Sequence, residues 1–433
     1  MHILLLGAGG FIGSELARRL QADGHRVTGL ARDAQRAARA NPALDWVAGD
    51  LRQMADPAAW AGLLDGMEVV VNAAGALQGG LRDDVGKVQY DAMIALYAAA
   101  QQAGVRRVVQ ISAAGAGVPG ESDFMASKAR ADAALAASGL DHAILRPGLV
   151  IGRNCFGGTE MLRIAAAAPL ARIDFAGTGA VQCVALADVA EATCRAVSGA
   201  GGAGGSFDLV EREARDLGAV IALHRAWLGL PPHRLHWRLP LALLRPVSAL
   251  ADLLGWLGWR SPLRSNAVAA LAHGVTGNAA EGAALLGRDA LSLPETLASM
   301  GAAGKADRWH ARLAGLMPLA LAALVALWLG SGLLGLLRTD AAAQVLVDGG
   351  MGDALARACV VGGSLADIAI AGGLLLRPAL VPALRASLLL ALAYCAGSLA
   401  FRADLWLDPL GPMLKVLPVI ALTALCLAIA EER

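Results

Sequence analysis

The stretch HILLLGAGGFIGSELARRL (residues 2–20) joins an apolar run, a glycine-rich turn and a helical pattern without interruption. The run at 2–6 predicts a buried β-strand, because a strand covered on both faces reads as a continuous apolar segment. Ile12, Leu16 and Leu20 recur at the spacing of one helical face. The stretch therefore predicts a strand that turns directly into a helix.

The turn itself, GAGGFIG (7–13), carries glycine where a side chain would obstruct either a ligand or the packing. Gly7 permits a tight turn, Gly10 lets the backbone approach a pyrophosphate, and Gly13 lets the helix pack closely on the strand. The helix N-terminus then faces the phosphates with its free N–H groups. The prediction of a dinucleotide site rests on the strand–turn–helix context, because glycines alone are common in this chain.

Five further apolar runs alternate with helical patterns over the first 150 residues. They are RVTGLA (26–31), DWVAG (45–49), MEVVVNAAG (67–75), RRVVQIS (106–112) and HAILRP (142–147). This rhythm predicts an α/β fold with a doubly wound parallel sheet covered on both faces. We expect a Rossmann core at 1–155 and a less regular substrate or cap part at 156–305, in which the glycine-rich stretch 199–206 forms a loop.

Bulk composition narrows the possible functions. The 433 residues carry a net charge of +1 and no basic block, which argues against nucleic-acid binding. The six cysteines lack ligand spacing, so neither a metal site nor a disulfide framework is predicted. The segment HRLHWRLPLALLRPVSALADLLGWLGW (233–259) is strongly apolar with arginines at intervals. It fits either an interfacial amphipathic segment or a helical cap over a substrate cleft.

From Leu313 onward the chain becomes almost uniformly apolar. The uncharged run at 313–337 suffices to cross a bilayer, which takes about 20 apolar residues. Three more candidate spans follow, near 354–376, 382–401 and 412–430. We therefore predict an all-α, four-helix transmembrane domain at 306–433.

One carboxylate, Asp367, falls near the middle of the second predicted span. An intramembrane acid is costly and normally faces a partner or a cavity. Ser398 on the third span and Thr423 on the fourth are the partners that we expect. The glycines around Asp367 favour close helix packing.

Taken together, several motifs resemble the short-chain dehydrogenase/reductase superfamily in its extended or atypical branch. These are GAGGFIG (7–13), GDL (49–51), VNAAG (71–75), ISAAG (111–115), SK (127–128) and LRPGLVIG (145–152). The resemblance covers roughly residues 1–300 and implies that the domain binds NAD(P)(H). It also places Asp188 at an acidic position common in this branch, where a structural and a functional role are equally open.

The resemblance further implies two groups of cofactor-contacting residues. The group at the phosphates and the adenine comprises Gly7, Gly10, Phe11, Ile12, Gly13, Asp50 and Leu51. The group toward the nicotinamide comprises Ala73, Ala74, Gly75, Ser112, Lys128 and Pro147.

The choice between NAD and NADP depends on the end of the second predicted strand. An NAD site places a carboxylate there for the ribose 2′-OH. Ala31 stands at that position and Arg32 follows, whose guanidinium suits a 2′-phosphate. Asp33 is close enough to compete for the role, but we interpret it as a turn residue. NADP(H) is therefore favoured, with NAD(H) as the alternative.

The stretch FMASK (124–128) departs from the family pattern, because Phe124 stands where these enzymes carry a catalytic tyrosine. Phenylalanine has no ionisable group, so Ser112 and Lys128 remain as the candidate catalytic residues. In one interpretation the protein is a reductase in which Lys128 or a bound water supplies the proton. In the other, the nucleotide is a structural or sensing ligand, as in the accessory nucleotide-binding subunit of respiratory complex I, which the chain also resembles.

The tail resembles the DoxX-like membrane family in architecture and placement. We therefore predict a membrane-anchored NAD(P)(H)-dependent oxidoreductase, acting on a lipophilic or quinone-like small molecule in the bilayer. The alternatives are a non-catalytic NADP(H)-binding assembly or redox-sensing protein, and an enzyme like the nucleotide-sugar epimerases and dehydratases. We expect a multi-pass protein of a bacterial inner membrane, with the Rossmann domain and both termini cytoplasmic. A membrane redox partner or a homo-oligomer is compatible with this picture.

Overall fold

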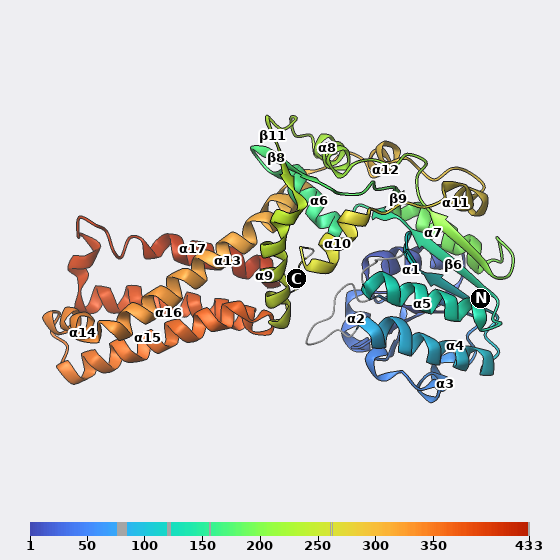
Figure 1. Cartoon of the computed structure of the whole chain (residues 1–433). Coiled ribbons are helices and arrows are strands. Elements are labelled where there is room, and N and C mark those ends of the chain that lie inside the picture. Colours follow the sequence, from blue (N-terminus) through green and yellow to red (C-terminus); the bar gives the residue numbers. More distant parts are fainter. Residues whose placement is uncertain (76–84, 119–122, 156, 260, 262, 432–433) are drawn as a thin grey trace. The chain divides into compact units, whose positions relative to one another are not determined.

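A computed structural model shows the fold of the chain (Figure 1). The structure describes residues 1–75, 85–118, 123–155, 157–259, 261 and 263–431. It divides into two compact units: Met1–Leu253 with Arg260–Ala311, and Leu254–Trp259 with Arg312–Arg433. The chain thus enters the second unit briefly, returns to the first, and leaves it again at the start of the helical tail.

A parallel sheet forms the centre of the first unit (Figure 1). Within the described residues it has seven strands in the order β10-β6-β5-β4-β1-β2-β3. The strands are β1 (His2–Leu6), β2 (Arg26–Ala31), β3 (Asp45–Ala48), β4 (Val69–Asn72), β5 (Arg107–Ile111), β6 (His142–Pro147) and β10 (Gly205–Leu209). The first six coincide with the predicted apolar runs, which confirms the doubly wound fold. The winding reverses between β1 and β4, where such sheets bind their ligands.

Helices cover both faces of this sheet. In β1, Ile3 and Leu5 contribute to one buried core, while Leu4 and Leu6 contribute to the other, because successive side chains point to opposite faces. The first core is covered by α1 (Phe11–Ala22), α7 (Leu186–Val197) and α11 (Ala279–Leu286). The second is covered by α3 (Ala61–Leu64), α4 (Ala92–Gln102) and α5 (Asp123–Ala137). A short helix, α2 (Ala34–Ala40), connects β2 to β3.

The part of the first unit after β6 adds two short parallel strand pairs. One pairs β7 (Leu149–Ile151) with β9 (Cys183–Ala185), and the other pairs β8 (Ala171–Ala176) with β11 (Leu235–Pro240). The helices of this part are α6 (Gly158–Ala167), α8 (Leu217–Trp227), α9 (Arg245–Trp256), α10 (Ser265–His273) and α12 (Leu293–Ser299).

The apolar segment 233–259 is not one continuous helix. Its first half forms β11, a 3₁₀ turn follows at Leu241–Leu244, and only the second half is helical, as α9. Proline explains the division: Pro240 ends the strand, and Pro246 lies in the first turn of α9, where its missing N–H breaks no helical hydrogen bond.

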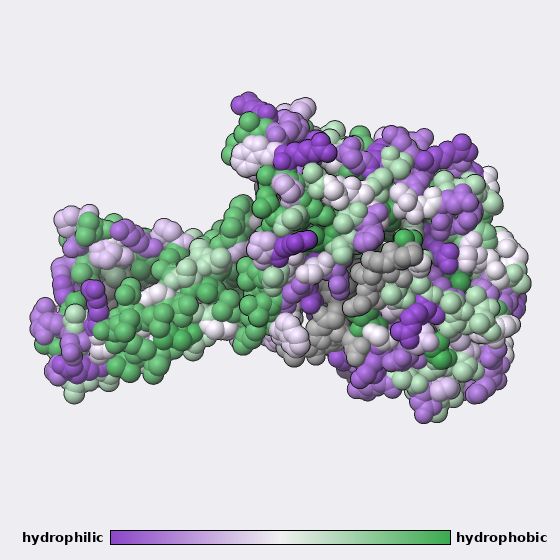
Figure 2. All heavy atoms as spheres, viewed as in Figure 1, coloured by the Kyte–Doolittle hydropathy of each residue, from purple (hydrophilic) through white to green (hydrophobic). Residues whose placement is uncertain are grey.

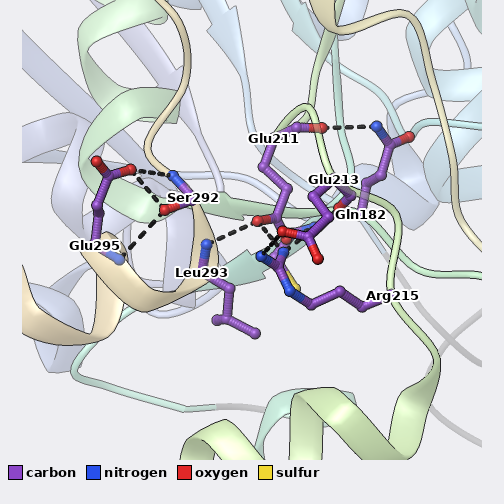
Figure 3. Close-up of polar contacts among 8 residues, drawn as sticks. Gln182, Glu211, Glu213, Arg215, Ser292, Leu293 and Glu295 are labelled. Carbon is purple, nitrogen blue, oxygen red and sulfur yellow. Dashed lines mark hydrogen bonds and ion pairs between the residues drawn. The ribbon is translucent and has the colours of Figure 1, made fainter.

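A buried glutamate ties the end of the first unit to its middle (Figure 3). Glu211, only 1% exposed, pairs with Arg215 and accepts a hydrogen bond of 2.7 Å from the Leu293 backbone N–H. The Gln182 side chain donates to the Glu211 carbonyl oxygen. A capping box between Ser292 and Glu295 then starts α12. Arg215 and the Leu293 N–H bind one carboxylate oxygen and the Cys183 N–H donates to the other at 3.0 Å, so we assign Glu211 a structural role.

The second unit is a helical bundle with a strongly apolar exterior (Figure 2). Its helices are α13 (Lys305–Leu337), α14 (Thr339–Asp348), α15 (Asp353–Leu375), α16 (Leu380–Phe401) and α17 (Val416–Glu431). Among the described residues, α13, α15 and the helix that includes α16 are long and apolar enough to cross a membrane, whereas α17 is a shorter apolar helix. The four predicted spans are thus all helical, and α14 is an addition that the sequence did not suggest.

Asp367 lies in this bundle, but with other partners than those predicted. Its Oδ2 accepts a hydrogen bond of 2.6 Å from Ser331 of α13, and its Oδ1 accepts one of 2.8 Å from Tyr394 of α16. Ser398 instead donates to the Cys395 carbonyl oxygen, and the Thr423 hydroxyl lies 3.4 Å from that of Ser387. The expectation of Ser398 and Thr423 was therefore wrong, because it ignored the rotation of each helix about its own axis.

Candidate functional site at the carboxyl edge of the sheet

The glycine turn between β1 and α1 is packed so tightly that its glycines cannot be exchanged freely. Gly7 has a φ of 75°, and a Cβ there would stand 2.7 Å from the Ala73 carbonyl oxygen. A Cβ on Gly13 would stand 2.0 Å from the Gly7 carbonyl oxygen. At Gly9, by contrast, a Cβ would meet only the Trp46 ring, at 3.9 Å. The turn thus has no room for a side chain at Gly7 or Gly13, whereas Gly9 could carry one.

The N-terminus of α1 is left without a side-chain cap, as a phosphate-binding helix requires. Gly10 is the N-cap residue, and its own N–H donates to the Gly7 carbonyl oxygen at 2.9 Å. The helix dipole and the first N–H groups of α1 therefore suit an anion. Phe11 and Ile12, which begin the helix, are half-buried, and Phe11 packs against the core on the α1 face. This cradle fits the diphosphate of a dinucleotide.

Except for Lys128, the residues predicted to lie toward the nicotinamide are at the ends of β4, β5 and β6, at the same edge of the sheet as the end of β1. The Ala73 N–H donates to the Leu6 carbonyl oxygen, so the end of β4 lies directly beside the end of β1. Ser112 donates its N–H to the Leu145 carbonyl oxygen, and Ala114 donates to that of Pro147. Ala74, which follows Ala73, donates its N–H to the Asn72 side chain at 3.0 Å.

Lys128 projects from α5 into this edge. A Cβ on Gly75 would stand 3.9 Å from the Lys128 Nζ, so the lysine lies against the segment predicted to line the dinucleotide. The amine is only 7% exposed and donates to the Ile111 carbonyl oxygen at 2.9 Å. Burial lowers the pKa of Lys128 to about 8, although the charge of Asp132 opposes this shift. A buried amine with this pKa can exchange a proton near neutral pH.

Asp132 is the residue that sequence reasoning missed. It is 2% exposed, and its Oδ2 accepts a hydrogen bond of 2.6 Å from the Ser112 hydroxyl and a longer contact of 3.4 Å from Arg146. Burial raises the pKa of the Asp132 carboxyl, while the Ser112 hydrogen bond and the charge of Lys128 counteract the rise. Its Oδ1 is buried without a hydrogen-bond partner in the described part of the chain. The available signal was its position four residues after Lys128, on the same face of a helix.

The ring of Phe124 takes the place beside the lysine where the family carries its phenol. The Lys128 Nζ lies 5.6 Å from the ring centroid. Neither tyrosine of the first unit substitutes for it: Tyr97 is 3% exposed and directs its hydroxyl to Gln110 in the core, and Tyr90 stacks on the Arg130 guanidinium. Burial also raises the pKa of Tyr97, so this phenol is no proton donor near neutral pH.

The adenine end of the site is more exposed. Asp33 is the N-cap of α2 and accepts a hydrogen bond of 2.9 Å from the Arg36 N–H, which is the turn role that we predicted. Asp50 caps the short 3₁₀ helix that begins with Leu51 and pairs with Arg52. That pairing lowers the pKa of Asp50, with a smaller contribution from the charge of Arg32. Arg32 is exposed and close enough to Asp50 for this electrostatic effect.

Asp188 lies outside this edge and serves the packing of the first unit. It is fully buried on α7, where it accepts hydrogen bonds of 2.6 Å from Arg288 and 2.7 Å from the Leu291 N–H. These bonds hold the segment that leads to α12. Of the two roles left open by the sequence, the contacts fit the structural one.

Two family models match separate parts of the chain. Residues 7–197 match a family model described as NAD(P)H-binding, and residues 325–424 match the DoxX-like family. A ceramide reductase of Caulobacter vibrioides (strain NA1000 / CB15N) is 30% identical over 169 residues, which are 39% of this chain and 52% of that protein. The match thus spans about half the length of this curated relative.

Solved structures with a similar fold include both reductases and epimerases. The NADPH-dependent quinone oxidoreductase QOR2 of Escherichia coli, in complex with NADPH, has a TM-score of 0.51 at 22% identity, covering 69% of this chain and 99% of that one. The UDP-glucose 4-epimerase of Thermotoga maritima, with UDP-glucose, has a TM-score of 0.51 at 18% identity, covering 69% and 96%. At these identities the likeness concerns the fold alone. The chain therefore joins an NAD(P)-binding Rossmann domain, with the fold of short-chain dehydrogenase/reductase-like reductases and epimerases, to a C-terminal DoxX-like membrane domain.

Proposed function

We propose that the protein is a membrane-bound, NAD(P)H-dependent reductase that acts on the carbonyl group of a lipophilic substrate. The observation that carries the proposal is the buried Lys128 amine beside Gly75, whose pKa of about 8 suits a proton donor near neutral pH. Strongly shifted pKa values cluster at functional sites, which favours a catalytic role for this lysine. Lys128 thus offers a proton source in place of the phenol that Phe124 removes.

In this proposal Lys128, Asp132 and Ser112 have different roles. A nicotinamide held at this edge would supply a hydride to the carbonyl carbon, so the carbonyl oxygen would need one proton from the protein. Lys128 gives that proton, directly or through one water, and recovers another from solvent. Asp132 offsets the charge of the lysine, and it orients the Ser112 hydroxyl through the 2.6 Å hydrogen bond. We therefore assign Asp132 a positioning role, and Lys128 the catalytic one.

The lipophilic substrate class has two supports. The first is the similarity to a ceramide reductase, because ceramide is a lipid. The second is an exposed apolar surface on the first unit, carried by the neighbouring segments β8, β11 and the beginning of α9. Its large exposed side chains are Leu170, Ile173, Leu235, Trp237, Leu243, Val247, Leu250 and Leu253.

Charge gives this apolar surface a membrane-facing character. The stretch 217–251 contains no acidic residue, and Arg234, Arg238 and Arg245 are exposed within it. Apolar side chains mixed with arginines suit the headgroup region of an anionic leaflet. Of the two interpretations of segment 233–259, we therefore favour contact with the bilayer, from which a lipid substrate would enter.

A binding-only protein is the competing function, and one observation favours it. The Ser112 hydroxyl donates its proton to Asp132, so this proton is not available to a substrate oxygen. An epimerase or dehydratase is less well supported, because those reactions rely on the missing phenol.

The deciding experiment is NADPH oxidation by the full-length protein in lipid nanodiscs. The substrates are a long-chain ketone, a long-chain β-keto amide and a quinone. We expect oxidation with one of the long-chain carbonyl compounds. Tight NADPH binding without oxidation by any of these compounds would favour the binding-only function instead.

The preference for NADPH is a separate prediction that depends on Arg32. We expect the full-length protein to bind NADPH more tightly than NADH, because a guanidinium at the end of β2 pairs with a 2′-phosphate. Arg32→Ala should remove most of the difference, which corresponds to about 1.5–3 kcal/mol for one charge-assisted contact. Calorimetry with both nucleotides measures this. Arg36→Ala, on the neighbouring helix α2, is the control, and equal affinities in the parent protein would contradict the prediction.

We also propose that the Rossmann domain and both termini are cytoplasmic. The bundle has one end with Arg377 and with Arg385, which pairs with Glu431 at the end of α17, and another end with Asp340 and Asp353 paired to Arg357. The positive-inside rule favours the first end as cytoplasmic, although Arg338, Arg402 and Lys415 weaken the contrast. Arg433 itself lies outside the described residues. A reporter fused after it should be active in the cytoplasm, and activity only in the periplasm would exclude this arrangement.

A further inference from the structure

A pocket of about 180 Å³ lies within the second unit, between α13, α16 and the beginning of α17. Apolar side chains such as Leu327, Val416 and Val419 form most of its wall. The Trp328 and Tyr394 rings, whose centroids are 6.4 Å apart, also line it. Two polar side chains complete the wall, Ser331 and Lys415.

The polar part of this pocket is organised by a carboxylate behind the wall. Asp367 of α15 is 2% exposed and is not itself a lining residue. The hydroxyls of Ser331 and Tyr394 each donate a hydrogen bond to it, at 2.6 and 2.8 Å. Both side chains are exposed on the surface of the described bundle. Both side chains thus line the pocket, and each hydroxyl proton is directed to Asp367 and not into the pocket.

This arrangement determines what the pocket can recognise. A hydroxyl that has donated its only proton keeps lone pairs and acts solely as an acceptor. Ser331 and Tyr394 can thus accept a hydrogen bond from a ligand but cannot donate one to it. At hydrocarbon depth an acceptor without a donor is unfavourable, because no water is there to replace the partner. Lys415, which is exposed, carries only donors and requires an acceptor.

We propose that this pocket binds the polar part of an amphiphile that carries a hydrogen-bond donor, namely a hydroxyl or an amide N–H. The donor bonds to the oxygens of Ser331 and Tyr394, the apolar wall holds the adjoining chain, and Lys415 binds an acceptor or anionic group of the same molecule. A ketone of the same shape offers only an acceptor to the two oxygens and binds more weakly. The proposal is independent of the nucleotide site.

The test uses a photoreactive long-chain alcohol and the matching ketone, each with a diazirine in its chain, on the full-length protein in nanodiscs without nucleotide. Mass spectrometry measures labelling of peptides from α13, α16 and α17. We expect the alcohol to label these peptides about tenfold more than the ketone, which corresponds to one net hydrogen bond. Equal labelling by the two probes would overturn the proposal.

Two variants separate recognition from structural support. Asp367→Asn places an amide NH₂ opposite one hydroxyl, which frees that hydroxyl's proton for the pocket, so the alcohol-to-ketone ratio should fall toward one. Tyr394→Phe should also lower the ratio, whereas Ser398→Ala, on the same helix and outside the pocket, should not. If Asp367→Asn and Tyr394→Phe reduce thermal stability but leave the ratio unchanged, the cluster only supports helix packing. If the protein is oligomeric and neither probe labels it, the pocket would instead be covered by a second copy of the chain.

Discussion

Lys128→Met is expected to reduce NADPH-dependent turnover by about a thousandfold, within the range that general acid catalysis contributes. Methionine keeps the apolar part of the side chain and removes the buried amine beside Gly75, whose pKa is about 8. Nucleotide affinity should fall much less, because the glycine turn remains intact. The measurement is kcat with the best long-chain substrate, alongside NADPH binding by calorimetry. Lys305→Met, at an exposed lysine of the same chain, is the matched control.

The pH dependence provides a second readout of the same residue. An amine with a pKa of about 8 carries its proton below that pH and loses it above. Turnover should therefore decrease as the pH rises through about 8, and Lys128→Met should abolish this decrease. A parent profile that is flat from pH 6 to about 10, or a Lys128→Met enzyme with normal kcat, would exclude Lys128 as the proton donor.

Phe124→Tyr then distinguishes an intact reductase from a degenerate one. The new hydroxyl would stand near the Lys128 ammonium, whose charge lowers the pKa of a phenol. In a reductase that already uses Lys128, the rate should change little or fall through crowding. A large gain would mean that the native site lacks an effective acid.

Gly13→Ala is expected to weaken nucleotide binding by at least about a hundredfold, because its Cβ would stand 2.0 Å from the Gly7 carbonyl oxygen. The Cβ is fixed to the backbone of α1 and the oxygen belongs to the backbone of the turn, so the clash must displace either α1 or the turn by a substantial fraction of an ångström. Gly9→Ala offers a control only four residues away. Among the described residues its Cβ would meet nothing nearer than the Trp46 ring at 3.9 Å, so the affinity of this variant for NADPH should stay within a few-fold of the parent.

Calorimetry with NADPH measures both variants, and thermal unfolding without nucleotide shows whether the fold survives. A Gly13→Ala protein that is folded and binds normally would refute the assignment of this turn. If Gly9→Ala weakened binding as strongly as Gly13→Ala, the outer side of the turn would have to be in contact with the nucleotide.

Most strands of the sheet were predictable, because the central ones are buried on both faces and therefore read as apolar runs. Strand β10 was not predicted, because it is only partly buried and begins at Gly205, inside the stretch 199–206 that we expected to form a loop. The turn at 7–13 was predictable for a related reason: only glycine fits where a Cβ would meet backbone atoms, as at Gly7 and Gly13. The first helix of the tail was equally clear from its uncharged length, although the helix itself begins earlier, at Lys305.

The features that the sequence did not predict depend on the rotation of each helix about its own axis and on contacts between residues far apart in the chain. Asp132 was overlooked because a single acid on a helix resembles a solvated residue until the burial of its face is known. Ser331 and Tyr394 were overlooked because neither lies near Asp367 in sequence, and hydropathy does not reveal which faces of three helices meet. The division of segment 233–259 into a strand and a helix was not predicted, because the pairing of β11 with β8 joins residues more than 60 apart in the chain.

Residues 254–259 belong to the second unit, and this limits where the polypeptide can be cut to separate the two units. There the Trp259 indole donates to the Leu375 carbonyl oxygen at 2.6 Å, and the Arg377 N–H donates to that of Leu257. A polypeptide ended after Lys305 would retain these residues but lose Leu375 and Arg377, the partners of Trp259 and Leu257. The nucleotide domain can therefore not be separated by removing the tail alone. A soluble version of it would also need residues 254–259 redesigned.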